Sequence, residues 1–416
     1  MYAVMRHRNY RLLWFGEFVS LLGDRALLVA LPYFVYQQTN STLATALLAL
    51  THYLPGLLLG SFAGVLADRW DRRRILVAVN VAQALVILLL LLAPSPGLLW
   101  VAYAVTLAEH TLGMLVMPAA GALLPVTVPE ASRPQANALI GVCSTVARIV
   151  GPLLGGVVIA AGGLGSVVVL DAASFALAAL LFSLLRVPRA QDAPGSARAS
   201  LVETWRALAR EWREGVSEIT RRRTLLALFV TMNVTSFGGT LVDPFWVAYV
   251  RTRLQGGPEA MGLLSTTGAC GALVAGLVMA GVSARVPLRA LVGYGTVLVG
   301  AVMVTLYHQS SLSAALALVF VMGFPLIVSN VAASTLIQNA TPDRLRGRVY
   351  GALGTTNAFV GVLAVSLAAL VGERAGVVTM LTLAGAITAV AGVVGLLLLP
   401  RTDAADGRTA EGVETA

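Results

Sequence analysis

The sequence contains no lysine, two cysteines and few charged residues of either sign. Charged residues make up 12% of its 416 residues, whereas a soluble domain carries roughly 25%. So little charge does not cover a water-facing surface, which excludes a soluble enzyme, a nucleic-acid-binding protein and a disordered chain. The two cysteines, Cys143 and Cys270, lie inside apolar runs, so a secreted disulfide scaffold is excluded as well.

The absence of lysine also excludes an ATPase site of the phosphate-loop type, because the loop G-x-x-x-x-G-K-[ST] requires that residue. The four histidines and two cysteines form no cluster with the spacing of metal ligands. No catalytic motif is present. We therefore expect the chain to be no enzyme and to hold neither a metal ion nor an organic cofactor.

What the chain does have is a series of long, continuous apolar runs, with 57% hydrophobic residues in all. A helix that spans a bilayer needs about 20 apolar residues, and continuous runs lack the alternation of a membrane β-barrel. Charged and Gly/Pro breaks between the runs predict an all-α integral membrane protein with twelve transmembrane helices. The predicted spans are residues 10–36, 44–67, 75–93, 98–124, 136–160, 166–186, 224–250, 259–281, 289–307, 313–338, 349–371 and 377–399.

The arginines fix the predicted orientation of these spans. With the N-terminus inside, 24 of the 29 arginines fall in cytoplasmic segments, and three fall outside: Arg251, Arg253 and Arg374. By the positive-inside rule, both termini are expected in the cytoplasm of a bacterial cell, with the chain crossing the inner membrane many times. The net charge of +9 therefore indicates membrane topology and not nucleic-acid binding.

One long connection divides the chain into two six-helix halves, residues 1–186 and 224–400, followed by a cytoplasmic tail, 401–416. The connection, 187–223, contains an amphipathic helix with apolar residues at helical spacing. A position at the lipid headgroups is favoured for this helix, and docking of a partner protein is the alternative. Its apolar residues are Leu201, Trp205, Leu208, Trp212, Val216 and Ile219.

A short repeat supports the two-half design. The loop before the fifth span has Pro129 followed by an acid and, four residues after the proline, Arg133. The loop before the eleventh span repeats this pattern with Pro342 and Arg346, 213 residues later. Two parallel repeats of six helices are one of the two repeat architectures of membrane transporters.

The loop after the second span resembles the signature loop of the major facilitator superfamily, G-x-L-x-D-R-x-G-R-R-R. It runs from Gly64 to Arg74, with Asp71 in place of the usual glycine. The resemblance implies a gating loop in which Gly64 permits close helix approach and Asp68 meets the positive end of another helix. Its arginines, Arg69, Arg72 and Arg73, would grip carboxylates or headgroups; the alternative is that they only fix topology.

The gating hypothesis has a geometric consequence for Asp68. In an outward-open state its carboxylate is expected within about 5 Å of the N-terminal backbone of the eleventh helix, near residues 347–351, because that end is positive. In an inward-open state the contact should be broken.

The fifth span resembles the antiporter motif of the same superfamily, G-x8-G-x3-G-P-x2-G-G, with alanine at the first two glycine positions. Small residues at this spacing allow close helix packing, and the proline bends the helix. The resemblance implies a proton-coupled exporter; a generic kinked packing helix is the alternative. The residues concerned are Ala138, Ala147, Gly151, Pro152, Gly155 and Gly156.

The whole chain resembles the drug:proton antiporter branch that includes macrolide-efflux-like and enterobactin-exporter-like proteins. Further shared features are residues 8–14, RNYRLLW, the pair Gly23-Asp24, and residues 346–349, RGRV. The resemblance implies a monomeric secondary active transporter that exports small amphiphilic molecules, a drug or a secreted metabolite, driven by the proton gradient. A lysophospholipid flippase or a metabolite uniporter of the same fold is the alternative. A membrane sensor or an intramembrane enzyme is disfavoured, and the substrate's identity stays open.

Ionisable residues inside the predicted spans are concentrated in the first half. A charge at bilayer depth costs about 2.5–3.5 kcal/mol on insertion scales, so each needs a reason. Glu17 lies at the inner end, with a role at the headgroups as one interpretation. Asp171 and Asp243 lie toward the outer ends, where solvation or helix capping is expected. His52 and His110 are interpreted as polar residues with satisfied hydrogen bonds, and a proton relay is the alternative. The central residues are Asp24, Arg25, Glu109 and Arg148.

Three of these central residues, Asp24, Glu109 and Arg148, fall at the same depth and form the predicted proton switch. Arg148 is always charged and should seek a carboxylate. An arginine partner favours the ionised form of a carboxyl group and a dry cavity favours the protonated form, so a carboxyl that moves between them exchanges a proton. Asp24 is favoured for pairing and Glu109 for proton exchange, with Arg25 the poorer partner. A static ion network is the alternative.

Overall fold

The computed structural model describes residues 4–187, 201–282 and 286–400, except for the side chains at 60–69, 201–208 and 279–282. Every regular element in these ranges is a helix. The first half contains α1 (Arg8–Thr39), α2 (Thr42–Arg69), α3 (Arg72–Leu88), α4 (Trp100–Gly113), α5 (Val116–Thr127) and α6 (Arg133–Ser183), with short 3-10 turns beside them. The rest contains α7 (Leu201–Arg221), α8 (Arg223–Thr240), α9 (Asp243–Thr252), α10 (Pro258–Val282), α11 (Leu288–Tyr307), α12 (Leu312–Ala340), α13 (Asp343–Ala375) and α14 (Val377–Leu398).

The helix boundaries have local causes in the sequence. At the end of α1, Asn40 adopts the left-handed conformation that stops a helix, and Ser41 then caps α2 by accepting a hydrogen bond from the Ala44 N–H. Asp71 caps α3 in the same way, accepting from the Arg74 N–H over 2.9 Å. Gly376 takes a positive φ of 83° between α13 and α14.

Ten helical segments in the described residues are long and apolar enough to cross a membrane, or eleven if the bent pair α8 and α9 is one span. The difference from the expected twelve arises in α6, which joins the predicted fifth and sixth spans into one element of 51 residues. At 1.5 Å per residue a straight helix of this length would extend about 77 Å, more than twice the roughly 30 Å of a bilayer core.

α6 is not straight, because the chain reverses inside it. Gly163 has a non-helical conformation, with a φ of 70°. Near the start of α6, the Ala136 carbonyl accepts a hydrogen bond from the Tyr10 hydroxyl; just beyond its end, the Arg186 N–H donates to the Asn9 side chain. Both ends of α6 therefore lie beside the start of α1, and the two arms on either side of Gly163 run antiparallel.

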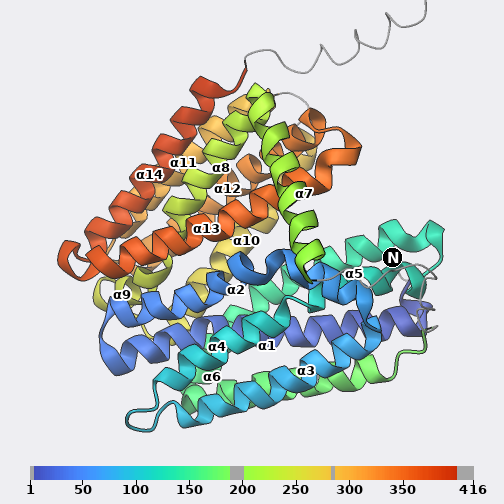
Figure 1. Cartoon of the computed structure of the whole chain (residues 1–416). Helices are drawn as coiled ribbons and strands as arrows, with labels where there is room; N and C mark the ends of the chain where they lie inside the picture. Colours follow the sequence, from blue (N-terminus) through green and yellow to red (C-terminus); the bar gives the residue numbers. More distant parts are fainter. Residues whose placement is uncertain (1–3, 188–200, 283–285, 401–416) are drawn as a thin grey trace, which may run out of the picture.

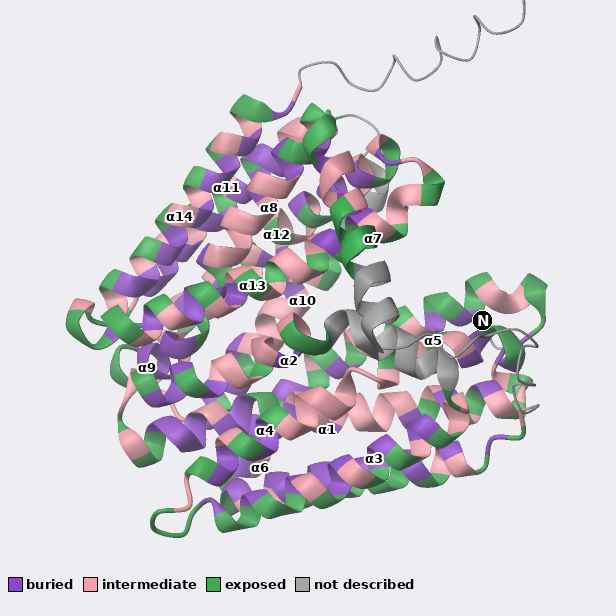
Figure 2. Cartoon of the chain, in the orientation of Figure 1, coloured by how far each residue is buried: buried purple, intermediate pink, exposed green. Residues whose placement is uncertain are grey.

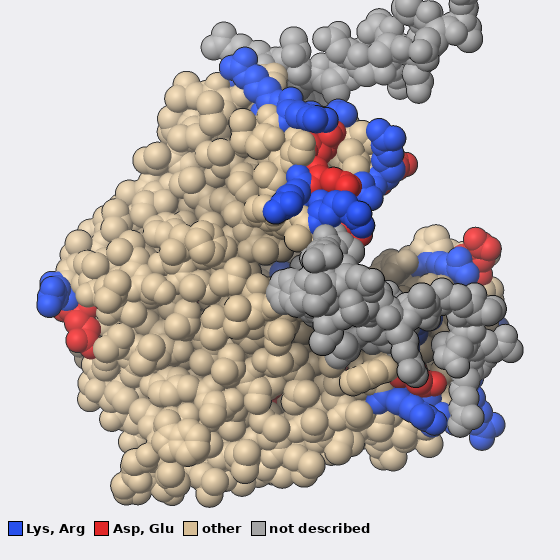
Figure 3. Space-filling view, in the orientation of Figure 1, with Lys and Arg blue, Asp and Glu red and all other residues tan. Residues whose placement is uncertain are grey.

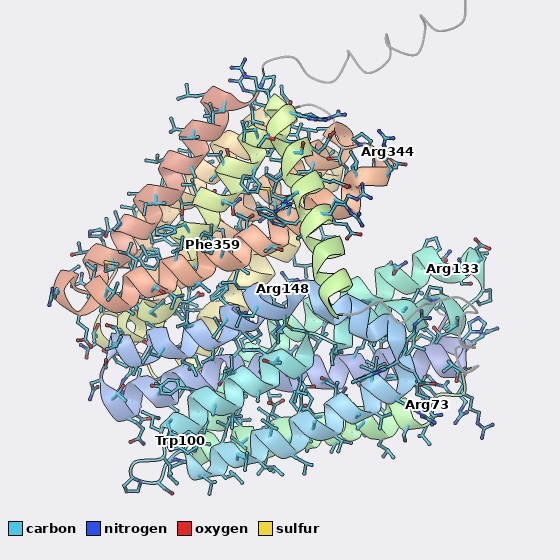
Figure 4. All side chains as sticks on the ribbon, in the orientation of Figure 1. Arg73, Trp100, Arg133, Arg148, Arg344 and Phe359 are labelled. Atoms are coloured by element: carbon cyan, nitrogen blue, oxygen red, sulfur yellow. The ribbon has the colours of Figure 1, made fainter. Side chains whose placement is uncertain are left out.

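The helices form two bundles that meet at one end of the molecule and separate at the other. In Figure 1, α1–α6 form the lower bundle and α8–α14 the upper one; they converge on the side of α9 and spread apart on the side of the N-terminus. We name the two ends by their charges. Arg73, Arg133 and Arg344 lie at the arginine-rich end, where the surface is indented between the bundles (Figures 3 and 4).

The buried clusters follow the same division. At the opposite, arginine-poor end, one apolar core includes residues of both halves, among them Ala30 and Val35 of α1 and Phe245 and Tyr249 of α9. Toward the arginine-rich end each half has a core of its own. The first half packs around Leu13, Leu76 and Phe182, and the second half around Ile219, Leu228 and Val349.

The residues exposed on the outward faces of the helices, green in Figure 2, are apolar. Leu370 is 77% exposed, Leu397 73% and Leu277 71%. Such surface is stable in lipid, whereas in water each exposed Å² would cost about 25 cal/mol relative to burial. Trp70 follows α2, next to the arginines that begin α3, and Trp100 begins α4 at the other end of the bundle. Both are exposed, which is the placement of tryptophans at membrane surfaces. The fold is that of a multi-pass membrane protein.

The amphipathic helix α7 packs on its own chain. Gly215 lies so close to the Arg348 backbone of α13 that a Cβ would overlap it, and Glu214 forms an ion pair with Arg348 at 2.5 Å. Ile219 is 2% exposed. The described part of α7 therefore belongs to the second half, a contact that neither of the two expectations for this helix included.

Candidate functional site

Three glycines bring the central part of α1 against both arms of α6. A Cβ on Gly151 would overlap Arg25, a Cβ on Gly155 would overlap the backbone of Ala26, and a Cβ on Gly23 would overlap the Asp171 and Ser174 side chains. Glycine at these positions allows the helix axes to approach closely. The ionisable residues that neighbour these glycines therefore lie at one level in the first half.

Five residues of this level form what we call the polar cluster: Asp24, His52, Glu109, His110 and Asp171. They come from α1, α2, α4 and α6. The carboxyl groups of Asp24, Glu109 and Asp171 are close enough to repel one another electrostatically. The described residues contain no group of three or more His, Cys, Asp or Glu arranged to hold a metal ion.

Asp171 is fully buried, at 0% exposure, and the expectation of a solvated or capping residue is wrong. Its Oδ1 accepts a hydrogen bond from the Ser174 hydroxyl at 3.3 Å, and among the described residues its Oδ2 has no partner. The reason is the close approach of Gly23, which encloses the carboxyl group between α1 and the second arm of α6.

Glu109 is linked to two histidines in a continuous chain. Its Oε2 lies 3.0 Å from the His110 Nδ1, and the His110 Nε2 lies 2.9 Å from the His52 Nδ1. Gln83 of α3 contacts the other carboxylate oxygen, donating from Nε2 to Oε1 over 3.4 Å. The histidines thus bond each other, and His110 also forms an ion pair with a carboxylate.

The expected pair between Asp24 and Arg148 is not formed. Among the described residues, no carboxylate lies within 4.0 Å of Arg148 or of Arg25. The two arginines instead repel each other electrostatically, because Gly151 brings Arg25 next to the first arm of α6. Arg148 is exposed and lies between the two bundles, as Figure 4 shows.

Glu17 lies seven residues before Asp24 on α1 and so on the same helix face, two turns nearer the arginine-rich end. It interacts electrostatically with Tyr10 and Cys143. Glu17 is therefore separate from the polar cluster but lies along the same side of α1.

Hydrogen bonds join the two halves from the arginine-poor end to the middle of the molecule. The Tyr53 hydroxyl of α2 donates to the Asp243 carboxylate of α9 at 2.8 Å, and the Thr45 hydroxyl donates to the Pro244 carbonyl at 2.7 Å. Asp243, expected to be solvated or capping, begins α9 and also accepts this bond from the other half. Further bonds run from Ser41 to Glu373 and from Thr266 to the Ile149 carbonyl.

Besides the Asp243 carboxylate, the second half offers neutral polar groups at this level. The Ser236 hydroxyl donates to Asn357, and the Asn233 amide bonds its own helix at the Phe229 carbonyl. Phe359 follows Ala358, the residue of α13 opposite Gly56, and is 49% exposed. The two halves thus differ in chemistry at the level where they meet.

Comparisons with known proteins agree with this architecture. A family model described as transmembrane secretion effector, a group of the major facilitator superfamily (MFS), matches residues 1–414. The chain belongs to this family of MFS transporters. It is therefore a membrane transporter and not an enzyme.

Two relatives and one solved structure illustrate the similarity. The transporter is 21% identical over 381 residues to macrolide efflux protein A of Streptococcus pyogenes, covering 89% of this chain and 92% of that protein. It is 26% identical over 373 residues to the multidrug efflux pump Tap of Mycolicibacterium fortuitum, covering 88% and 89%. A bacterial homologue of the human lysosomal transporter Spinster, crystallised in an inward-facing conformation, has the same fold, with a TM-score of 0.70, 16% identity and coverage of 94% and 95%.

The signature loop of the transporter is described in part. The surroundings of Gly64 and the side chains of Asp68 and Arg69 lie outside the described part of the structure. The proposed contact of Asp68 with α13 lies outside it as well. Arg73 bonds the carbonyls of Phe182 and Ser183 at the end of α6, which ties α3 to α6 within the first half. Arg72 is the first residue of α3.

The Asp71 substitution in the signature loop has a structural explanation. Its carboxylate caps α3, so the acid replaces the usual glycine turn by an N-cap.

The antiporter motif divides between two interfaces. Gly151 and Gly155 pack on α1, whereas Gly156 faces the backbone of Pro258 and Glu259 in α10 of the other half. The Pro152 carbonyl lies against Gly262, also in α10. Ala147 is fully buried, but Ala138 is exposed and takes no part in this close packing.

Sequence reasoning singled out Asp24, Arg25, Glu109 and Arg148 but missed how other residues complete the site. Tyr53 and Gln83 carried no signal, because polar residues in apolar helices are common. His52 and His110 were identified as intramembrane residues, and their contact depends on the rotation of α2 relative to α4. That rotation is set by packing, not by the local sequence.

Proposed function

We propose that this MFS transporter exports small amphiphilic molecules in exchange for protons, by rocking of its two halves. The observation that carries the proposal is the position of the polar cluster, at the level where a core shared by both halves gives way to two separate cores. A site at this level changes its surroundings when the halves rock. Two relatives are named as efflux proteins, which supports export over import.

We propose further that the arginine-rich end is cytoplasmic, by the positive-inside rule, with both termini on that side. The described arrangement is then open toward the cytoplasm and closed toward the outside. The two arms of α6 would each cross the membrane, and with α8 and α9 as one bent span the chain would have twelve crossings. The antiparallel course of the arms supports this count.

The chemistry of the two halves supports an amphiphilic substrate. The first half presents Arg148 and the polar cluster, whereas the second half presents neutral and aromatic groups such as Asn357 and Phe359. A molecule with one polar and one apolar side fits between such surfaces. A drug or a secreted metabolite has this character.

The carboxyl groups support proton coupling. Asp, Glu and His inside membrane helices are the groups that form proton relays in pumps and transporters. Asp24 and Glu109 are the two carboxyl groups that we assign to the exchange. Arg148, which lies between the halves, would stabilise whichever of them is ionised when the halves move.

The test is transport into inverted vesicles that carry the Asp24→Asn or Glu109→Gln variant. Erythromycin and ethidium serve as probe substrates, and a pH-sensitive dye follows proton flux. Removal of a proton-transfer group costs about 10²–10⁴-fold in rate, so we expect proton-driven uptake to fall by at least about tenfold in each variant. Folding is checked by size-exclusion chromatography.

Two outcomes would contradict the proposal. If both variants keep the full proton-driven rate, the coupling site lies elsewhere. If a protonophore leaves uptake by the wild-type transporter unchanged, the protein is a uniporter or a flippase of this fold, not an antiporter.

A further inference from the structure

We propose that His110 and His52 carry the coupling proton between Glu109 and the space between the two halves. This inference rests on the proposed proton coupling and identifies the path that the proton takes. It decides between the two interpretations that the sequence leaves open for these histidines, ordinary polar side chains and a proton relay, and it gives the path of the proton.

The first support is the unbroken geometry of the chain. His110 uses both ring nitrogens, with Nδ1 3.0 Å from Glu109 and Nε2 2.9 Å from His52. The two rings are nearly perpendicular, with centroids 4.3 Å apart. The contact between the two rings is a hydrogen bond, and the contact between His110 and Glu109 is an ion pair at 3.0 Å. Reorientation of side chains, without movement of the helices, lets a proton cross both gaps.

The second support is a gradient of exposure along the chain. The side chain of Glu109 is 12% exposed and that of His110 is 25% exposed, whereas His52 is an exposed residue. Glu109 is thus enclosed and needs a path for its proton. His110 connects it to His52, the exposed residue of the relay.

The third support is the direction that His52 faces. It lies two turns after Thr45 and about one turn before Gly56 on α2, so all three share a helix face. Thr45 bonds α9, and Gly56 faces Ala358 of α13 at 3.7 Å from a built Cβ. This face of α2 therefore points to the second half and not to lipid.

The proton balance of the relay closes without another reactant. A hydronium ion in the water between the halves gives a proton to the Nε2 of His52 and becomes water. His52 then passes its Nδ1 proton to the Nε2 of His110. His110 passes its Nδ1 proton to the Glu109 carboxylate, so one proton is gained by Glu109 and both rings end neutral. Release runs through the same bonds in reverse and restores both starting tautomers.

The charges around the relay act in one direction. Arg25 of α1 lies near His52, and Asp24 of α1 and Asp171 of α6 lie near Glu109. These charges favour a proton at Glu109 over one at His52, and Arg25 also interacts electrostatically with Asp24. From α3, Gln83 adds a neutral contact to Glu109, and Arg148 of α6 lies next to Arg25.

The relay is also connected to the contact between the halves. Tyr53, next to His52, bonds Asp243 of α9. The rings of His52 and Tyr53 pack edge to face, with centroids 5.1 Å apart, so the relay is in contact with the residue that bonds the other half. This connection gives the relay a direct route to the opening of the other side.

The experiment compares two transport modes of the His52→Gln and His110→Gln variants in proteoliposomes. Glutamine keeps hydrogen bonding but cannot pass a proton through a ring. We expect proton-driven erythromycin transport to fall by about tenfold or more, as on loss of a proton-transfer group. Equilibrium exchange of labelled for unlabelled erythromycin, which needs no net proton transfer, should stay within about twofold of the wild type.

The matched control is His308→Gln. His308 bonds the Val304 carbonyl one turn earlier at the end of α11, in the other half, and this variant should keep both transport modes. A second readout is chemical rescue. Millimolar imidazole should restore proton-driven transport to His52→Ala, because position 52 is exposed, and should not restore it to His110→Ala.

Each remaining outcome is decisive. If the histidine variants keep proton-driven transport while Glu109→Gln loses it, the relay is wrong and the proposed function stands. If Glu109→Gln and Asp24→Asn also keep it, the proposed function itself has failed. If exchange falls together with proton-driven transport and imidazole restores neither variant, the histidines are structural and the relay is overturned.

Discussion

A transporter with the substitutions Gly56→Cys and Ala358→Cys should lose nearly all transport on oxidation and recover it on reduction. A Cβ built on Gly56 lies 3.7 Å from the Ala358 Cβ, close to the mean of about 3.8 Å in native disulfides. Gly56 lies on α2 and Ala358 on α13, so the bond would join the two halves at the level of their contact. Rocking requires this contact to open, and a covalent bond prevents it.

The measurement is substrate exchange in proteoliposomes, with the cross-link quantified by mass spectrometry. The single variants Gly56→Cys and Ala358→Cys are the controls and should transport under both conditions. The native cysteines are one buried and one partly buried residue, Cys143 and Cys270, and stay in place throughout. A fully cross-linked protein that still exchanges substrate would show that α2 and α13 do not separate during transport.

The same substitution, glycine to alanine, should have opposite effects at two positions of α6. At Gly155 the new Cβ overlaps the Ala26 backbone, which cannot turn away as a side chain does. We expect Gly155→Ala to destabilise the transporter by about 1–3 kcal/mol, the cost of overpacking. At Gly141 the Cβ meets nothing within 4 Å, and the better helix propensity of alanine should stabilise by up to about 1 kcal/mol.

The measurement is thermal unfolding in detergent, followed by the fraction of monodisperse protein after heating. Gly141→Ala serves as the control, because it lies in the same arm of α6 and makes the same change of composition. Equal effects of the two substitutions would show that α1 leaves room for a Cβ at position 155. Gly155 would then have no packing role.

The sequence determined the class of protein, because hydropathy is a local property. The length of each apolar run and the scarcity of charge require a lipid environment, whatever the arrangement of the helices. Motif spacing then led to the superfamily, which the family match confirms. The described helices lie at all the predicted spans. They count as ten or eleven membrane-length segments, because α6 continues through Gly163 and because α8 and α9 form a bent pair.

The tertiary structure decided which side chains meet. Depth counting placed Asp24, Glu109 and Arg148 at one level, but depth does not give the rotation of each helix about its axis. That rotation is set by close approaches such as Gly151 on Arg25 and Gly23 on Asp171, whose partners lie more than a hundred residues away. These approaches separate Arg148 from Asp24, bury Asp171 and leave Glu109 to bond His110. A sequence pattern shows that a residue needs a partner inside the membrane, and only the packing of distant helices decides which partner it has.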